Sequence, residues 1–541
     1  MLLNKKNYFE DLGYMVDCSR GAVPKISSLK KLVDILSSFG YNYLMLYTED
    51  TYELDGEPYF GYMRGRYSKQ EIKELDLYCQ EKGMELRACI QTLAHLGRLK
   101  RHSSYTSLFE IDNILTVKDE KVYAFIDKML SGISKLFTSK KVHIGMDEAW
   151  ALGRGKFLDQ NGIVPKTQIM SYHLERVAKI AASYGLECDI WADMLCEAYN
   201  ECEDKQNFKL DIPSNITPII WRYWVKSKEA STEEFELYQK ITKNKMGYAG
   251  GAQKWNGFVP ENTYSFLALK EQIESCIQFN VKRYLVTAWA DGAADASLFS
   301  TLPAIFYASL LAHQLPLDIK AKQYFKEVTG MAFHSFMKID ALSRLDSAKD
   351  EHCFNNLSFI YLYNDLFQGL YDEAVLENSQ KLFHNIALSL KKNITHPQYG
   401  YLFLPLYDLA KIDEVKASLG KEIYQHYQEK DILSLKKDIR KTKRVLLLLE
   451  KFMEDYEVQW HVENKSFGFE KQIIRLGGLK ERLHYVIRQL NRYVHKKIDS
   501  IEELEEEHLK ISSNYWDHDN PKNSSHHNYR EIVSSGSLLD I

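Results

Sequence analysis

Two adjacent carboxylic acids, Asp147 and Glu148, carry the clearest chemical signal in the sequence. They end the run VHIGMDE over residues 142–148, in which a short β-branched segment closes on a glycine. Two carboxyl groups in one apolar site do not ionise freely together, so one tends to keep its proton near neutral pH. A proton donor beside a fixed negative charge suits acid-catalysed cleavage of an acetal. An Asp-Glu pair alone usually belongs to a solvated loop, so its meaning depends on what surrounds it.

Further polar and aromatic side chains recur at the ends of apolar segments along the chain. They are Arg20, Asp50, His95, His143, Trp191, Asp193, Trp221, Tyr248, Trp289 and Asp291. Tryptophans from three segments could form an apolar box the size of a pyranose ring, with carboxylates and an arginine bridging its hydroxyls. For each tryptophan alone, core packing is the alternative. The two histidines could equally be hydrogen-bonded core residues or residues that orient the acids.

Short apolar strands that alternate with amphipathic helices must position these side chains. The predicted strands are residues 14–18, 43–47, 85–90, 141–145, 187–191, 218–223, 245–248 and 283–288. This alternation is typical of an α/β fold of the (β/α)8 TIM barrel type, in which the carboxyl ends of all strands meet at the catalytic rim. An open doubly wound sheet is the alternative. It is disfavoured because the first strand runs into DCSRG, not into a Gly-rich phosphate loop.

The strand pattern disappears after about residue 320 and long amphipathic segments replace it. We therefore predict a catalytic barrel over residues 1–318 and an α-helical C-terminal domain over residues 319–512. The helical domain is a candidate surface for a homodimer. Residues 513–541 are polar and rich in His and Asn, and we expect a flexible tail there.

Composition excludes several classes of partner and cofactor. The formal net charge of −4 gives no basic field for nucleic acid or an anionic membrane. No apolar run is long enough to span a membrane, and the N-terminus lacks the apolar core of a signal peptide, so we expect a cytoplasmic protein unless a leader was removed. The eight cysteines form no Cys-x-x-Cys pair, which favours reduced thiols and no zinc site.

Over residues 10–315 the sequence resembles the family 20 glycoside hydrolases, the β-N-acetylhexosaminidases. Their strand-four motif His-x-Gly-Gly-Asp-Glu is matched by residues 143–148 except at Met146. By this resemblance Arg20 holds ring hydroxyls O3 and O4, and Asp291, where glutamate is frequent, reads O4 and O6. The other family positions fall on Asp50, His95, Trp191, Asp193, Trp221, Tyr248 and Trp289.

Some features depart from the common family pattern. Many members carry an acid two residues after the strand-seven tyrosine, where this sequence has Gly250. Aspartate in place of glutamate at position 291 shortens the reach to O4 and O6, which leaves tolerance of both gluco and galacto epimers open. Because the first predicted strand begins near residue 14, we expect no small sheet domain of the kind that usually precedes the barrel. The resemblance is therefore greatest to compact bacterial exo-acting enzymes.

The resemblance implies removal of terminal β-GlcNAc or β-GalNAc from oligosaccharides or glycoconjugates, with retention and without metal or cofactor. Conventional retaining enzymes place an acid and a nucleophile about 5 Å apart across the bond, which adjacent acids do not easily do. In this family the 2-acetamido oxygen of the substrate attacks instead. Glu148 would be the general acid, Asp147 would accept the acetamido N–H, and Tyr248 would donate to the acetamido oxygen.

Two alternatives remain open from the sequence. The first is another retaining barrel glycosidase whose acid and nucleophile come from Asp50, Asp193 or Asp291. The second is a sugar-binding barrel without catalytic activity, because a fold alone does not guarantee activity.

Overall fold

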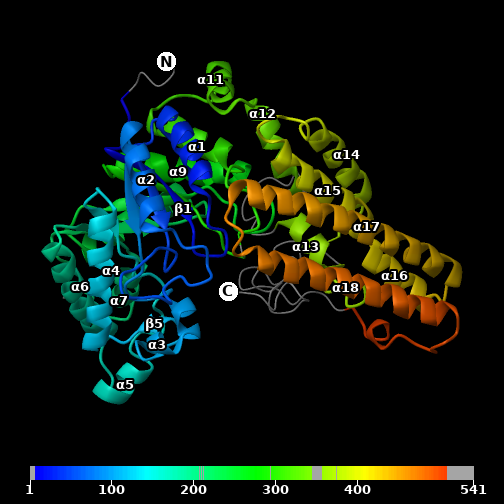
Figure 1. Ribbon diagram of the computed structural model, residues 1–541, viewed down its shortest axis with the longest axis horizontal. Coiled ribbons are helices and arrows are strands. Elements are labelled where there is room, and N and C mark those ends of the chain that lie inside the picture. Colours follow the sequence, from blue (N-terminus) through cyan, green and yellow to red (C-terminus); the bar gives the residue numbers. More distant parts are fainter. Residues whose placement is uncertain are drawn as a thin grey trace.

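The computed structural model describes residues 6–205, 208, 210, 212–292, 294–343, 356–372 and 375–508. Eight parallel strands in these residues close into a barrel in the order β1-β10-β9-β8-β7-β6-β3-β2 (Figure 1). The barrel confirms the predicted fold class, because each strand pairs with its neighbours in chain order. The strands are β1 Asp11–Asp17, β2 Tyr43–Tyr47, β3 Glu85–Cys89, β6 Lys141–His143, β7 Glu187–Trp191, β8 Ile216–Trp221, β9 Gly247–Gly251 and β10 Arg283–Ala288. A hairpin of β4 Phe109–Ile111 and β5 Ile114–Leu115 follows β3.

The strand before the acid pair ends earlier than predicted. β6 stops at His143 because Gly145 and Met146 adopt φ angles of +72° and +73°. This left-handed backbone does not continue a strand. A Cβ on Gly145 would also lie 1.9 Å from the side-chain oxygen of Gln91, so glycine is required there. The chain therefore turns directly from the barrel wall into the acid pair.

Helices cover the outside of the barrel, most of them amphipathic and α10 apolar on nearly every side. They are α1 Ile26–Ser38, α2 Lys69–Glu81, α4 Glu120–Leu136, α6 Lys166–Ser183, α7 Asp193–Asn200, α8 Lys228–Ile241, α9 Asn262–Gln278 and α10 Leu302–Ala312. A capping box between Ser68 and Glu71 begins α2. In α4 the buried residues Ile126, Met129 and Ile133 recur at helical spacing and face the barrel.

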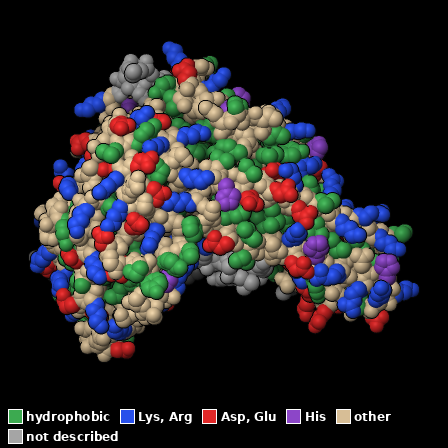
Figure 2. Space-filling view, viewed as in Figure 1, with side chains coloured by type: hydrophobic (Ala, Val, Ile, Leu, Met, Phe, Trp, Pro, Cys, Tyr) green, Lys and Arg blue, Asp and Glu red, His purple; other side chains and the backbone are tan. Residues whose placement is uncertain are grey.

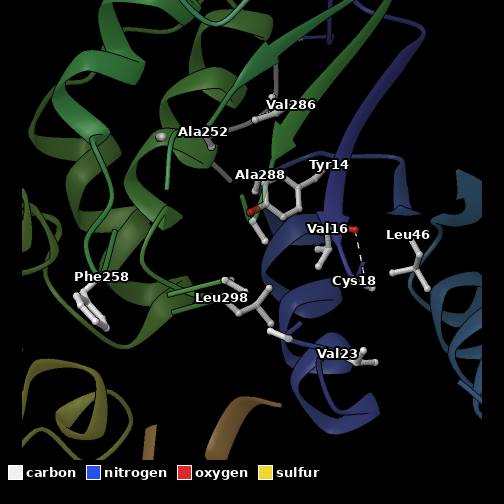
Figure 3. Packing of buried hydrophobic residues seen from close by; sticks show 14 of the residues in the cluster. Tyr14, Val16, Cys18, Val23, Leu46, Ala252, Phe258, Val286, Ala288 and Leu298 are labelled. Atoms are coloured by element: carbon white, nitrogen blue, oxygen red, sulfur yellow. Dashed lines mark hydrogen bonds between the residues drawn. The ribbon is translucent and has the colours of Figure 1, made fainter. Parts of the chain in front are cut away.

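Alternating residues of each strand divide the core into two layers. Tyr14 and Val16 of β1 join the large cluster between strands and helices, part of which is visible in Figure 3 beside Val286 of β10. Met15 of β1 joins a smaller cluster inside the barrel, together with Trp191 at the end of β7. The period of two along a strand explains this separation. It also decides which strand residues can reach a site at the barrel mouth.

Charged residues close the amino-terminal end of the barrel. Asp11 accepts from Arg87 at 2.7 Å and from Arg283 at 3.0 Å, and Lys141 lies 3.1 Å away. Burial by itself would raise the pKa of Asp11, but these cations outweigh it and lower the pKa to about 2. The folded state therefore favours the charged carboxylate.

We expect Asp11→Asn to lower the free energy of unfolding by about 2 kcal/mol at neutral pH, the value of the pKa difference. Because the folded pKa lies below the ordinary value of 3.8, this contribution is present above that pH and is lost as the pH falls towards 2. Urea unfolding near pH 7 and near pH 3 measures the difference. Glu74→Gln, which breaks the exposed pair with Lys30, is the control and should cost below about 0.5 kcal/mol. If Asp11→Asn lowered the free energy of unfolding equally at both pH values, this expectation would be contradicted.

The C-terminal region is helical and extends away from the barrel (Figures 1 and 2). Its helices are α11 Ile319–Thr329, α12 Phe333–Phe336, α13 Leu357–Tyr363, α14 Ser379–Lys391, α15 Gly400–Lys416, α16 Leu419–Gln428, α17 Ile432–Glu463 and α18 Phe469–Val494. The predicted boundary at residues 318–319 lies just before α11 and stays a prediction, and residues 513–541 lie outside the described residues. No helix in the described ranges has the length and apolar character needed to cross a membrane.

The connection between α17 and α18 returns to the barrel. The buried Glu463 at the end of α17 accepts from the backbone N–H of Leu298 at 2.7 Å and from the hydroxyl of Tyr401 at 3.0 Å. The backbone N–H groups of Lys25 and Lys465 bond across the same junction. The first turn of α18 is therefore held beside the loops at the barrel mouth.

Candidate active site

A cavity of about 190 Å³ opens at the carboxyl ends of the barrel strands. We call it the cup. Its lining consists of Arg20, His95, Asp147, Glu148, Trp191, Trp221, Tyr223, Trp255, Trp289 and Asp291. Most of the predicted site residues are therefore brought together, although they come from distant parts of the sequence.

The acid pair lies on a backbone turn that separates its two side chains. The backbone N–H of Trp191 donates to the backbone carbonyl of Gly145 at 3.0 Å, which fixes the start of the turn to β7. Glu148 has a φ of +52°, a left-handed conformation uncommon for a non-glycine residue. Asp147 is buried, whereas 43% of the Glu148 side chain is exposed. One acid thus points into the cup wall and the other lies at its opening.

Asp147 is held as a carboxylate by two neighbours. Gln91 donates to one oxygen at 2.8 Å, and the Nε2 of His95 lies 3.2 Å from the other. Burial would raise the pKa of Asp147, but His95 and Gln91 lower it below the usual value. Burial would conversely lower the pKa of His95, and the charge of Asp147 raises it to about 9. The pair is ionic at neutral pH.

Glu148 has the opposite tendency. Burial and the negative charge of Asp147 raise the pKa of Glu148 above its usual value. Its backbone N–H donates to Asp193 at 2.8 Å, and the other oxygen of Asp193 accepts from Trp221 Nε1 at 3.1 Å. Burial and Asp147 raise the pKa of Asp193 to about 7. Asp193 therefore positions both the backbone of Glu148 and the indole ring of Trp221, which forms a wall of the cup.

Aromatic rings form the remaining walls of the cup. Trp191 is fully buried and packs on the ring of His143, with centroids 4.2 Å apart. The indole N–H of Trp289 donates to the Tyr223 hydroxyl at 2.6 Å. Tyr223 stacks on Trp221, with centroids 5.3 Å apart. Such flat apolar faces suit the hydrophobic side of a sugar ring and exclude water.

Arg20 faces several carboxylates at the rim. Its guanidinium lies 3.4 Å from Asp291, 3.8 Å from Glu49 and 3.9 Å from Asp17. Burial would lower the pKa of Arg20, but Asp291 and Glu49 raise it, so the side chain stays charged. A fixed guanidinium between carboxylates can bind neighbouring hydroxyls through charge-assisted hydrogen bonds.

The prediction that Tyr248 reaches the site is wrong. Its ring lies on the helix-facing side of β9, where its hydroxyl donates to Glu234 at 3.3 Å and its ring stacks on Phe235. The neighbouring Ala249 faces the barrel interior instead, as the alternation of a strand requires. In the cup the only tyrosine among the described lining residues is Tyr223.

The structure also does not place Asp50 in the cup. Asp50 pairs with Arg64 and does not line the cavity. Glu49, with a φ of +50°, faces Arg20 in its place. His143 lies below the cup, where burial lowers its pKa to about 3 and keeps it neutral under Trp191.

Sequence reasoning missed four residues, namely Gln91, Glu49, Tyr223 and Trp255. Glu49 precedes the predicted Asp50, and Gln91 directly follows the predicted strand 85–90, so a polar residue at the end of a strand was the available signal for both. Tyr223 follows Trp221 by two residues and shares its side of the chain by the period of a strand. Trp255 lies beyond β9 in a loop, where no periodicity indicates direction.

Comparison with known proteins finds relatives of this chain. Two hexosaminidase D proteins are each 25% identical to the chain, the cattle protein over 214 residues and the human protein over 247. These alignments cover 38% and 44% of this chain, and 60% and 48% of the relatives, so the chain spans about half the length of the curated relatives it matches. Among solved structures, the Flavobacterium johnsoniae chitobiase is 13% identical with a TM-score of 0.48, covering 81% of this chain and 75% of that chain.

Family descriptions match both parts of the chain. The catalytic domain of glycosyl hydrolase family 20 matches residues 9–237, which include the acid pair and most of the barrel. The glycoside hydrolase 20C C-terminal domain matches residues 334–523, a range that includes α13 to α18. The chain therefore belongs to glycoside hydrolase family 20.

Proposed function

We propose that the protein is an exo-β-N-acetylhexosaminidase that removes terminal β-GlcNAc or β-GalNAc with retention. The observation that carries the proposal is the acid pair on the wall of the cup, where the pKa of Asp147 is lowered and that of Glu148 is raised. Such opposed environments assign a fixed charge and a proton donor. Family membership and relatives named hexosaminidase support the sugar class.

In the proposed mechanism the substrate supplies its own nucleophile. Glu148 protonates the glycosidic oxygen as the acetamido oxygen attacks the anomeric carbon, and the aglycone leaves as an alcohol. Asp147 accepts the acetamido N–H and stabilises the positive charge of the oxazolinium-like intermediate. Glu148 then takes a proton from the water that reopens this ring. Trp191, Trp221 and Trp289 hold the sugar and exclude bulk water.

We assign to Tyr223 the hydroxyl that steadies the acetamido oxygen. Because Tyr223 accepts from Trp289, its own proton is available to a substrate oxygen in the cup. We expect Tyr223→Phe to lower kcat/KM for an aryl β-GlcNAc by about 10²-fold, as for loss of one preorganised donor. Tyr248→Phe is the matched control and should retain kcat/KM. A folded Tyr248→Phe protein with the larger loss would contradict the assignment.

One assay tests the proposed activity. Nitrophenol release is measured from β-GlcNAc, β-GalNAc and β-glucose aryl glycosides under identical conditions. We expect hydrolysis of one or both acetamido sugars and almost none of the glucoside, since glucose lacks the internal nucleophile. Inhibition by a GlcNAc-derived thiazoline, which mimics the cyclised intermediate, should accompany it. Rapid hydrolysis of the glucoside would overturn substrate assistance.

A conventional retaining mechanism is the alternative. It requires a carboxylate free to attack, but Asp50 pairs with Arg64, and Asp193 holds Glu148 and Trp221. The third candidate, Asp291, lies 3.4 Å from the guanidinium of Arg20. Trapping with a 2-deoxy-2-fluoro glycoside would label a carboxylate in that mechanism, and mass spectrometry should find no such adduct here.

The expected cytoplasmic location and the homodimer through the helical region stay predictions of the sequence.

A further inference from the structure

The segment that follows β10 contributes to the cup and is also tied to the helical region. It carries Trp289 and Asp291, which both line the cup. A little further along, Gly292 and Asp295 accept hydrogen bonds from side chains of α18. Figure 1 shows the ends of α17 and α18 that approach the barrel. The helical region therefore reaches a segment of the active site, although the described lining of the cup contains none of its residues.

Arg475 of α18 makes two bonds to this segment. Its Nη1 donates to the backbone carbonyl of Gly292 at 2.7 Å and to the carboxylate of Asp295 at 3.0 Å. Gln472, one helical turn earlier, donates to the same oxygen of Asp295 at 2.8 Å. Arg475, Gln472 and Asp295 are all buried. Burial strengthens such charge-assisted bonds and removes competition from water.

Further contacts fix this anchor on the side of the helical region. The hydroxyl of Tyr456 in α17 donates to the backbone carbonyl of Asp295 at 2.9 Å. The guanidinium of Arg475 lies over two rings of α13, 5.3 Å from the centroid of Phe359 and 5.4 Å from that of Tyr363. A guanidinium over aromatic faces is held by their negative potential. The place of Arg475 is therefore set by the helices, and its bonds transmit that place to the barrel.

Both backbone neighbours of Asp291 are hydrogen-bonded. On one side, the N–H of Ala290 donates to the buried carboxylate of Asp17 at 3.1 Å. On the other side, the next carbonyl accepts from Arg475. The side chain of Asp291 is 34% exposed and lies 3.4 Å from Arg20, longer than a close hydrogen bond. The position of this carboxylate therefore depends on the backbone that Asp17 and Arg475 hold.

The buried pair of Arg475 and Asp295 is better explained by placement than by stability. Apolar side chains of similar volume often stabilise a protein as well as a buried ion pair does. Directional hydrogen bonds, in contrast, allow only one position of the segment relative to α18. A carboxylate that binds a sugar hydroxyl needs such placement, since a shift of about 1 Å can cost about 10²-fold in rate.

We propose that Arg475 is a positioning residue for Asp291 and thereby sets the preference of the cup for one ring hydroxyl of the terminal sugar. This inference rests on the proposed function. Asp291 accepts a hydrogen bond from the sugar hydroxyl, and Arg475 acts through the backbone of Gly292. Recognition of the hydroxyl depends on this contact, whereas protonation by Glu148 does not. The helical region is thus part of the specificity of the enzyme.

Deoxy sugars identify the hydroxyl that Asp291 binds. The measured quantity is the ratio of kcat/KM for an aryl β-N-acetylhexosaminide to that for its 3-, 4- or 6-deoxy analogue. Asp291→Asn should lower at least one of these ratios about tenfold, the value of one charged hydrogen bond. If Asp291→Asn alters none of the ratios, the inference is overturned.

The role of Arg475 is tested by Arg475→Met combined with Asp295→Asn, a double variant that leaves neither buried charge unpaired. It should lower the same ratio as Asp291→Asn, also about tenfold, and no other. Adding Asp291→Asn to the double variant should lower that ratio no further than Asp291→Asn alone, because both changes act on one contact. Equal losses of kcat/KM for all substrates, or a change in a different ratio, would overturn the positioning role.

The matched control is Arg482→Met combined with Asp365→Asn. These residues form a second Arg–Asp pair on α18, with bonds of 2.7 and 3.0 Å between residues of the helical region. The control removes the same chemical groups from the same helix without touching the segment after β10. It should leave every ratio unchanged, and a loss equal to that of the Arg475 variant would overturn the inference.

Circular dichroism and thermal unfolding check that each variant is folded. If the Arg475 double variant does not fold, Gln472→Met replaces it, because this change removes a single neutral donor to Asp295. It should lower the same ratio about threefold, and an unchanged ratio would overturn the inference. A parent protein that hydrolyses no aryl β-N-acetylhexosaminide refutes the proposed function. Normal hydrolysis with ratios that these variants leave unchanged refutes this inference alone.

Discussion

Glu148→Gln is expected to lower kcat/KM between about 10² and 10⁴-fold for substrates with sugar or alkyl leaving groups. Activated aryl glycosides need little protonation, so their kcat/KM should fall far less. Glutamine keeps the shape of the side chain and the backbone bond to Asp193, but its amide is too weak an acid to protonate the leaving group. The comparison of a nitrophenyl β-GlcNAc with a GlcNAc disaccharide measures this asymmetry. Equal losses for both substrates would show that Glu148 is not the general acid.

The pH profile provides a second measurement of the same residue. Because the pKa of Glu148 is raised, the active protonated form persists above the usual range of a carboxyl group, and activity falls as the pH rises through that pKa. This alkaline limb should disappear in Glu148→Gln. Asp193, with a pKa of about 7, titrates nearby, so Asp193→Asn is the control. If Asp193→Asn removes the limb while Glu148→Gln retains it, the profile belongs to Asp193.

The barrel was predictable because its signals are local and repeated. Each buried strand is a short apolar run, and each helix carries its apolar residues at helical spacing, so elements could be assigned without long-range information. The rule that barrel enzymes place their sites at the carboxyl ends of strands then brought Arg20, Asp147 and Trp289 together. Strand boundaries were less accurate, as at β6, where a left-handed turn ends the strand early.

The errors in the candidate site have two physical causes, one that acts beyond the strand ends and one that acts within β9. Beyond the end of a strand, the direction of a side chain depends on local backbone angles that the sequence does not display. At Glu49 a left-handed residue turns the chain and exchanges the expected roles of Glu49 and Asp50. Tyr248 lies one position out of phase with the interior of β9, so it faces the helices. Trp255 reaches the cup from a loop without any period.

Asp147→Asn is expected to lower kcat/KM by at least about 10³-fold for both activated and unactivated substrates, because it removes the charge that stabilises the intermediate. This uniform loss distinguishes Asp147 from Glu148. A simple structural defect could also reduce activity, so a second readout is needed. Asp147 raises the pKa of His95 to about 9, and NMR titration of His95 should show that pKa falling in the variant.

Gln91 provides the matched control for this experiment, because it is the other neighbour of Asp147 and carries no charge. Gln91→Leu removes a donor but leaves the ion pair with His95, so the pKa of His95 should stay high and the loss of activity should be smaller. Equal activity losses in Asp147→Asn and Gln91→Leu would mean that the geometry around Asp147, and not its negative charge, limits the reaction. We expect the negative charge of Asp147 to matter more than this geometry, because His95 lies only 3.2 Å from its carboxylate.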